Sequence, residues 1–450
     1  ESLITLSRES GALHLRVKFV LGRVKVDTTS FEFSILPTPS KPRPEGWRNY
    51  AITPDWSYYW DCNWYSQIWE KVEGKGRPVM KWDDPPQGLI EKVREAKVLG
   101  NGRGVGLPYL NPQYTCSPHP CPWDVNDQSP VKSLFDSDWA NMPSRYGWLK
   151  PVKSYRDWVG SVLSFYMREW GLAGYYVDEP YIAANFDLNL LSGSGWFDRE
   201  GNLRGSYHVM DMREYVKQMY IISYKYGRTG RPFTMVHASS FGMSPFWTSF
   251  AGSVCFGEGS WGVRKAGESI LDVVPLENLQ LYNGDAFGYI GTFFGMYLQQ
   301  QKDSPLCAKS YENTMGALAL HDMVPNGTDI YRGANVVLPI EIVKKDFGIG
   351  TKDVEFIGYW YADVPVESSD KYVKASTYTK PGRSLIVLVN TDVRKPHAST
   401  ISIHEKKLGL YGGCKVLDAV SAVELQSTDG IIEIQLEERE VKYLHVVPNE

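Results

Sequence analysis

The stretch that decides how the chain folds is Gly174-Tyr-Tyr-Val-Asp-Glu-Pro180, in which a short apolar run ends in two adjacent carboxylates. The run up to Val177 has the length and composition of a buried strand. Neighbouring side chains of a strand point to opposite faces, so Asp178 and Glu179 face one site only where the strand ends or bulges. Pro180 predicts that end, because it keeps the preceding residue extended.

On both sides of this stretch, residues 46–335 alternate short apolar segments with amphipathic ones. The predicted helices include one that begins near Ser154, one over Met210–Tyr226 and one over Gly88–Leu99. Alternation of this kind predicts a parallel sheet, and eight strands predict a (β/α)8 TIM barrel in the α/β class. The strand candidates are Tyr50–Thr53, Pro78–Trp82, Gly104–Tyr109, Gly174–Asp178, Phe233–His237, Ser253–Gly257, Leu279–Tyr282 and Ala317–His321.

Both flanks of the barrel have strand patterns. Residues 1–44 combine period-2 alternation with the proline-rich linker Pro37–Pro44, which predicts the remnant of an N-terminal β-domain. Residues 45–335 are the predicted barrel, and residues 336–450 are a predicted C-terminal β-sandwich. The strands expected in the sandwich are Tyr372–Tyr378, Ser384–Val389, Thr400–Ile403, Gly430–Leu436 and Val441–Val446.

Composition narrows the function classes. The net charge of -4 gives no electrostatic reason to expect nucleic acid, and no apolar run reaches the roughly 18 residues of a membrane helix. No pair of the six cysteines forms a Cys-x-x-Cys motif, so neither a zinc site nor a redox site is expected. The expected function also needs no metal or other cofactor. Cys116 and Cys121 either form a small disulfide or stay reduced. The 15 Trp, 28 Tyr and 17 Phe fill cores or, in polar loops, stack on sugars.

Polar residues follow almost every predicted strand, at the edge where barrel enzymes place their sites. A single one is more often a helix cap, but this many together indicate a binding site. His237 could equally be a satisfied core histidine, and Glu258 is a candidate second essential carboxylate. The substrate-binding candidates are His237, Tyr282, Asp285, Trp60, Asn63, Tyr109, Tyr176, His321 and Asp322.

Asp178 and Glu179 are the catalytic candidates, although a solvated turn is the alternative. The apolar run before them would partly desolvate both carboxylates, which raises the pKa of at least one. One protonated and one ionised carboxyl is the pair that acid-assisted glycoside cleavage needs. Which of Glu179 and Glu258 is the acid stays open at this point.

These motifs resemble those of family 123 glycoside hydrolases, which are β-N-acetylgalactosaminidases, and more closely those of uncharacterised glycoside-hydrolase-like relatives. The likeness covers roughly residues 30–340, with a similar C-terminal β-domain. The shared features are the Thr-Pro-x-Lys-Pro entry (Thr38–Pro42), the Gly-x-Tyr-x-Asp strand, the Asp198–Gly201 turn before a helix with Arg213, the strand end at His237 and the Gly257-Glu258 pair.

The resemblance implies a retaining, exo-acting β-N-acetylhexosaminidase without a cofactor. Asp178 would position the 2-acetamido group of the substrate, whose oxygen attacks the anomeric carbon, and Glu179 would protonate the leaving oxygen. A second hypothesis pairs Glu179 with Glu258 on a sugar that lacks the acetamido group, and a third is a non-catalytic carbohydrate-binding barrel. The expected partner is an oligosaccharide or glycoconjugate, and the expected location is extracellular or periplasmic. The sequence does not indicate an oligomeric state.

Overall fold

The computed structural model forms two compact units, Glu1–Pro37 and Thr38–Glu450, which are described separately. The residues that it describes are 4–18, 36–44, 46–49, 52–59, 105–110, 114–116, 140–141, 146–149, 151–170, 174–177, 184–185, 195–207, 209–227, 233–238, 248–257, 265, 267–293, 305–325 and 334–449. In the first unit, β1 (Ile4–Glu9) and β2 (Ala12–Val17) form an antiparallel hairpin, as the alternation predicts. The rest of the alternating pattern, at 19–35, and the predicted helix at 88–99 lie outside the described residues.

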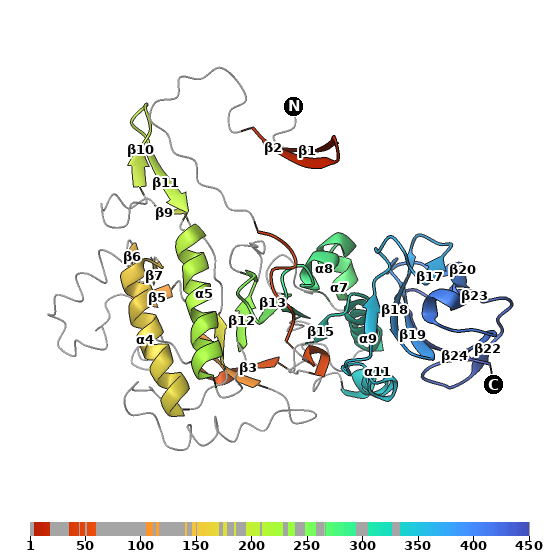
Figure 1. Ribbon diagram of the computed structural model, residues 1–450. Helices are drawn as coiled ribbons and strands as arrows, with labels where there is room; N and C mark the ends of the chain where they lie inside the picture. The colour runs from red at the N-terminus through yellow and green to blue at the C-terminus, as the bar shows by residue number, and fades with distance from the viewer. Residues whose placement is uncertain are drawn as a thin grey trace. The chain divides into compact units, whose positions relative to one another are not determined.

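The second unit is organised around a seven-stranded parallel sheet with the order β15-β14-β13-β12-β8-β4-β3 (Figure 1). Its strands are β3 (Ile52–Tyr59), β4 (Val105–Leu110), β8 (Gly174–Val177), β12 (Phe233–His237), β13 (Ser253–Phe256), β14 (Ile290–Phe293) and β15 (Val324–Pro325). Five of the predicted strands are confirmed, and Pro78–Trp82 lies outside the described residues. The described strands do not by themselves close a barrel.

Two predicted strands are wrong. Leu279–Tyr282 lies in helix α8 (Leu276–Tyr282), and Ala317–His321 lies at the end of helix α9 (Pro305–Leu320). Both are short apolar runs, and periodicity alone cannot distinguish a buried strand from a segment of buried helix. The strands of this region come instead a few residues later, as β14 and β15.

Helices cover the sheet on one side. The predicted helices are confirmed as α4 (Lys153–Trp170) and α5 (Val209–Tyr226), which pack on each other beside β8 and β12 (Figure 1). Tyr175 of β8 donates a 2.8 Å hydrogen bond from its hydroxyl to the carbonyl of Leu163 in α4. The other helical segments among the described residues are η1 (Trp47–Asn49), α7 (Ile270–Val273), α11 (Ala334–Phe347) and η5 (Glu405–Leu408). No described helix is long and apolar enough to cross a membrane.

The C-terminal region is a β-sandwich, as predicted, although helix α11 occupies the start of the predicted domain. One sheet has the order β16-β18-β19-β24-β21-β22 and the other β17-β20-β23. The strands are β16 (Glu355–Ile357), β17 (Val366–Ser368), β18 (Val373–Lys380), β19 (Arg383–Asn390), β20 (His397–Ile403), β21 (Cys414–Asp418), β22 (Glu424–Leu425), β23 (Ile431–Leu436) and β24 (Val441–Pro448). Pro381 and Gly382 make the turn between β18 and β19, and Gly382 has the positive φ of 80° that such a turn favours.

Strand β19 joins the sandwich to the rest of its unit. Its residues Ile386 and Leu388 face the core between the two sheets, whereas Leu385, Val387 and Val389 pack in a cluster with α9. A strand buried on both faces reads as a continuous apolar run, which is the pattern of Ser384–Val389. Two short sheets complete the described structure, with strands β9 (Ala184–Asn185), β10 (Gly195–Phe197) and β11 (Leu203–Tyr207), and β5 (Tyr114–Cys116), β6 (Ala140–Asn141) and β7 (Tyr146–Leu149).

Candidate active site

The candidate active site lies at the C-terminal edge of the parallel sheet, where β8 and β12 end side by side. Tyr176 pairs with Met235 in register, so Tyr176, Met235 and His237 lie on the same face of the sheet. The Tyr176 hydroxyl is hydrogen-bonded to Nδ1 of His237, and the two ring centroids are 5.6 Å apart. Both side chains are about 1% exposed, so this edge holds a rigid, preorganised polar pair.

The two faces of the sheet differ in chemistry. His237 pairs with Cys255, and Cys255 pairs with Thr292, so Ser253 and Thr292 share the face of Tyr176 and His237. The opposite face carries Val177 and Val236 together with Tyr175 and Thr234, and it packs against the helices. The side chains of Tyr176, His237, Ser253 and Thr292 therefore lie on the face of the sheet opposite to the one on which α4 and α5 pack.

Several predicted site residues lie outside the described residues. They are Asp178, Glu179, Glu258, Trp60 and Asn63. Asp178 and Glu179 follow directly on Val177, the last residue of β8, and Glu258 follows Phe256, the last residue of β13, by two positions. Tyr109 is described for its backbone, which pairs with Tyr176 at the same edge. Among the described residues, no three His, Cys, Asp or Glu side chains cluster so that they could hold a metal ion.

The structure separates four other candidates from this edge. Tyr282 and Asp285 precede β14, and His321 and Asp322 precede β15, so they lie toward the N-terminal edge of the same parallel sheet. The prediction that they follow strands is wrong, because the apolar runs before them are the helix ends of α8 and α9. In barrel enzymes the reaction takes place at the opposite, C-terminal edge. The four residues are therefore not grouped with Tyr176 and His237.

His321 is a packing residue in the contact between α9 and the sandwich. Its Nδ1 donates to the carbonyl of Ala317 at 2.7 Å, and its Nε2 accepts from the Tyr359 hydroxyl at 3.1 Å. The ring stacks on Trp360, with centroids 5.4 Å apart. Burial lowers the pKa of His321 to about 4, so the ring is neutral at pH 7. With both nitrogens engaged, it has no position left for a sugar hydroxyl.

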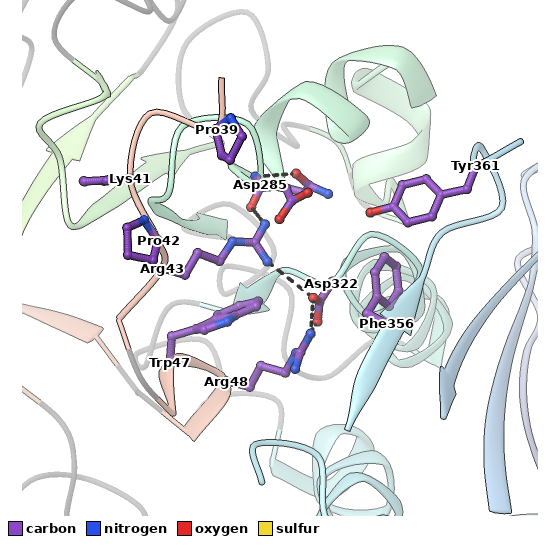
Figure 2. Close-up of a pocket in the computed structure, with 11 residues that line it drawn as sticks. Pro39, Lys41, Pro42, Arg43, Trp47, Arg48, Asp285, Asp322, Phe356 and Tyr361 are labelled. Carbon is purple, nitrogen blue, oxygen red and sulfur yellow. Dashed lines mark hydrogen bonds and ion pairs between the residues drawn. The ribbon is translucent and has the colours of Figure 1, made fainter. Parts of the chain in front are cut away.

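Asp322 is the centre of an ion-pair cluster that the sequence analysis missed. Its carboxylate accepts two hydrogen bonds from Arg48, at 2.7 and 2.6 Å, and lies 3.4 Å from Arg43. Both guanidinium groups lie over the Trp47 ring, at 4.3 and 4.9 Å from its centroid. Figure 2 shows these residues around one pocket. The only signal in the sequence is the arginines in and just after the proline-rich linker, and that signal does not identify their partner.

The comparisons with known proteins agree with this architecture. Residues 339–437 match the model of the glycoside hydrolase 123 C-terminal domain. The chain resembles an α-amylase from Geobacillus thermoleovorans in complex with acarbose, with a TM-score of 0.53, 9% identity and coverage of 89% of this chain and 98% of that one. It also resembles a GH27 β-L-arabinopyranosidase from Geobacillus stearothermophilus in complex with arabinose, with a TM-score of 0.51, 12% identity and 89% coverage of both chains.

A third similar structure is an α-amylase from Anoxybacillus, with a TM-score of 0.51, 11% identity and coverage of 82% of this chain and 80% of that one. No curated protein matches the chain in sequence. Similarity at this identity shows the fold, which in these neighbours is a TIM barrel followed by a β-sandwich-like region, and does not transfer their substrates. The family match is confined to the C-terminal sandwich, and together with the shared fold it shows a likeness to glycoside hydrolases of family 123.

Proposed function

We propose that the chain is a retaining, exo-acting β-N-acetylhexosaminidase of the N-acetylgalactosaminidase type, with Asp178 and Glu179 as its catalytic residues. The observation that carries this proposal is the buried Tyr176–His237 pair at the end of β8, because the two carboxylates come directly after that strand. We also propose that the seven described parallel strands belong to a closed (β/α)8 barrel whose mouth is this edge.

In the proposed reaction the substrate supplies its own nucleophile. The oxygen of the 2-acetamido group forms a bond to the anomeric carbon while the bond to the leaving oxygen breaks, and Glu179 gives its proton to that oxygen. Asp178 accepts a hydrogen bond from the amide N–H, which orients the group and stabilises the developing positive charge. Glu179 then removes a proton from water, and the water oxygen forms a bond to the anomeric carbon while the bond from that carbon to the acetamido oxygen breaks. The configuration is therefore retained.

Tyr176 and His237 would lie beneath the sugar subsite and support it. Their mutual hydrogen bond fixes both rings, so a sugar that binds over them does not have to order flexible side chains. Their burial also lowers the local dielectric, which favours a protonated carboxylic acid close by. The pair therefore supports an acid at this edge without itself transferring a proton.

The test is hydrolysis of an aryl N-acetyl-β-galactosaminide by the wild type and the Glu179→Gln variant. The expected loss of turnover is about 10²–10⁴-fold, which is the usual contribution of a general acid. Glu424→Gln, a change at an exposed glutamate of the sandwich, is the matched control and should keep full turnover. A thiazoline that mimics the cyclic intermediate should also inhibit hydrolysis by the wild type. Unchanged turnover in Glu179→Gln would reject the assignment.

A second candidate function uses Glu258 with Glu179 on a sugar without an acetamido group. The observation in its favour is that β13 ends at the same edge and that Gly257, with φ of 118°, turns the backbone directly before Glu258. This candidate predicts that a 2-hydroxy aryl glycoside is cleaved as fast as its 2-acetamido counterpart and that Glu258→Gln abolishes both reactions. Preference for the acetamido substrate, with thiazoline inhibition, would favour the first candidate instead.

A further inference from the structure

A pocket lies at the N-terminal edge of the parallel sheet, away from the candidate active site. Its volume is about 340 Å³, which falls within the range of small-molecule sites. Four segments form it: the proline-rich linker with η1, the loop that leads into β14, the loop that leads into β15, and the segment around β16 of the sandwich. The lining residues are Pro39, Lys41, Pro42, Arg43, Trp47, Arg48, Asn283, Asp285, Asp322, Phe356 and Tyr361.

The accessible part of the pocket wall combines aromatic rings with an acceptor. Tyr361 is 39% exposed, and Figure 2 shows its hydroxyl directed toward Asp285, with the Phe356 ring next to it. Within the described part of the chain, no hydrogen bond or ion pair engages the Asp285 carboxylate, while its backbone N–H bonds to the Asn283 side chain at 2.8 Å. Burial, and secondarily the Asp285 charge, raises the pKa of the Tyr361 phenol and keeps it a neutral donor.

The cationic side chains that line the pocket already form hydrogen bonds or ion pairs with other groups of the protein. Arg48 is bound to Asp322 through two hydrogen bonds, and Arg43 donates to the carbonyl of Asn283. Lys41 donates from Nζ to three backbone carbonyls, those of Ala251, Phe287 and Gly288, at 2.9, 3.1 and 2.7 Å. Burial, followed by the charge of Arg43, lowers the pKa of Lys41 to about 7, which reduces its mean charge further. A phosphate or sulfate would therefore meet the Asp285 carboxylate without an unengaged cation to balance it.

We propose that this pocket is a second, non-catalytic binding site for a neutral pyranose sugar. The apolar face of a sugar ring would stack on Tyr361 or Phe356, and its hydroxyls would donate to Asp285 and accept from the Tyr361 hydroxyl. The volume accommodates about one or two rings. This inference goes beyond the proposed function, because the site lies at the other edge of the sheet and uses none of the catalytic candidates.

The test counts sugar molecules bound to the full chain. Crystals are soaked with galactose and, separately, with N-acetylgalactosamine, and affinity in solution is followed by ligand-observed NMR. The wild type should show a pyranose between Tyr361 and Asp285. Tyr361→Ala and Asp285→Asn should each weaken binding at this pocket by about tenfold, a change of about 1.4 kcal/mol. Tyr411→Ala, at a tyrosine that is 78% exposed elsewhere on the sandwich, is the matched control and should bind like the wild type.

The outcomes separate this proposal from the proposed function. Asp178→Asn should keep the pyranose at Tyr361, because it touches only the catalytic edge, so loss of hydrolysis and loss of this binding are independent readouts. Melting temperatures of Tyr361→Ala and Asp285→Asn within a few degrees of wild type show that weakened binding is not unfolding. The proposal is overturned if no pyranose binds at Tyr361, if both variants bind like wild type, or if inorganic sulfate occupies the pocket in preference to the sugars.

Discussion

At the C-terminal edge of the parallel sheet, the hydroxyl of a tyrosine is hydrogen-bonded to a histidine on the neighbouring strand. At the N-terminal edge, an aspartate instead binds two arginines that lie far away in sequence, in and just after the proline-rich linker. The first pair, Tyr176 and His237, comes from neighbouring strands and leaves the linker and the sandwich uninvolved. The second cluster, around Asp322, brings together the linker and the loop into β15, beside the sandwich. The proposed function assigns the chemistry to the first edge, whereas the ion pairs around Asp322 hold distant segments of the unit together at the second.

Removal of the Asp322 carboxylate should give the largest loss in the free energy of unfolding. A small loss would contradict the structural role of the N-terminal edge. Asp322→Ala leaves the largely buried guanidinium groups of Arg48 and Arg43 without their carboxylate. The loss of one partner of a buried ion pair costs about 3–5 kcal/mol. Chemical denaturation should show a loss of that size in the free energy of unfolding. A change below about 1 kcal/mol would mean that the N-terminal edge is not the structural one.

Acidification tests the neutral His321 beside the same edge. Its pKa is about 4 when folded and near 6.5 when unfolded. The unfolded chain therefore binds the extra proton first, and stability contributed by the neutral ring is lost as pH falls from about 6.5 toward 4. Between pH 7 and 4.5 the wild type should lose about 2–3 kcal/mol more than His321→Gln. Equal pH profiles of unfolding free energy in the two proteins would contradict the buried, neutral histidine.

A matched pair of glycine substitutions sharpens the role of the linker. Gly288 has φ of 71°, and a Cβ there would lie 1.9 Å from the Lys41 carbonyl oxygen. Gly201 has φ of 81°, but a Cβ there meets nothing within 4 Å. Gly201→Ala should cost about 1 kcal/mol for the backbone alone, and Gly288→Ala should cost about 2 kcal/mol more because the linker must shift. Thermal unfolding of both variants provides the measurement, and equal losses would show that the linker contact is unimportant.

The smallest effect expected from the loss of a contact concerns the proposed catalytic edge. Tyr176→Phe removes the hydroxyl that binds His237 and keeps the ring in place. We expect kcat to fall about tenfold, equivalent to about 1.4 kcal/mol in the activation barrier, with a melting temperature close to that of wild type. Steady-state kinetics on the aryl N-acetyl-β-galactosaminide measure it. A variant with normal kcat but lower stability would instead place Tyr176 among the structural residues.

Much of the fold was predictable because its signals are local. The apolar run before Asp178, the largely apolar segment Phe233–His237 and the β-branched run Ser384–Val389 are each sufficient to predict a strand. The segments Leu279–Tyr282 and Ala317–His321 were predicted wrongly, because a few apolar residues fit a strand and a buried helix end equally well. Misplacing these two segments moved Tyr282 and His321 to the wrong edge of the sheet.

The candidate site was predictable only in part. His237 could be predicted from its position at a strand end, and Tyr176 from the strand itself, but their hydrogen bond depends on a register between two strands that the sequence does not specify. The arginine cluster depends on contacts across roughly 270 positions of the chain, such as Arg48 with Asp322. Long-range pairs of this kind leave no local periodicity, so a single sequence does not reveal them.

The most direct test of the division between the two edges is a crystal structure of the Glu179→Gln variant with an uncleaved N-acetyl-β-galactosaminide. The account predicts a sugar ring just beyond the ends of β8 and β12, near Tyr176 and His237, with its acetamido group beside Asp178. A sugar bound only in the pocket near Asp322, with nothing at the ends of β8 and β12, would contradict it.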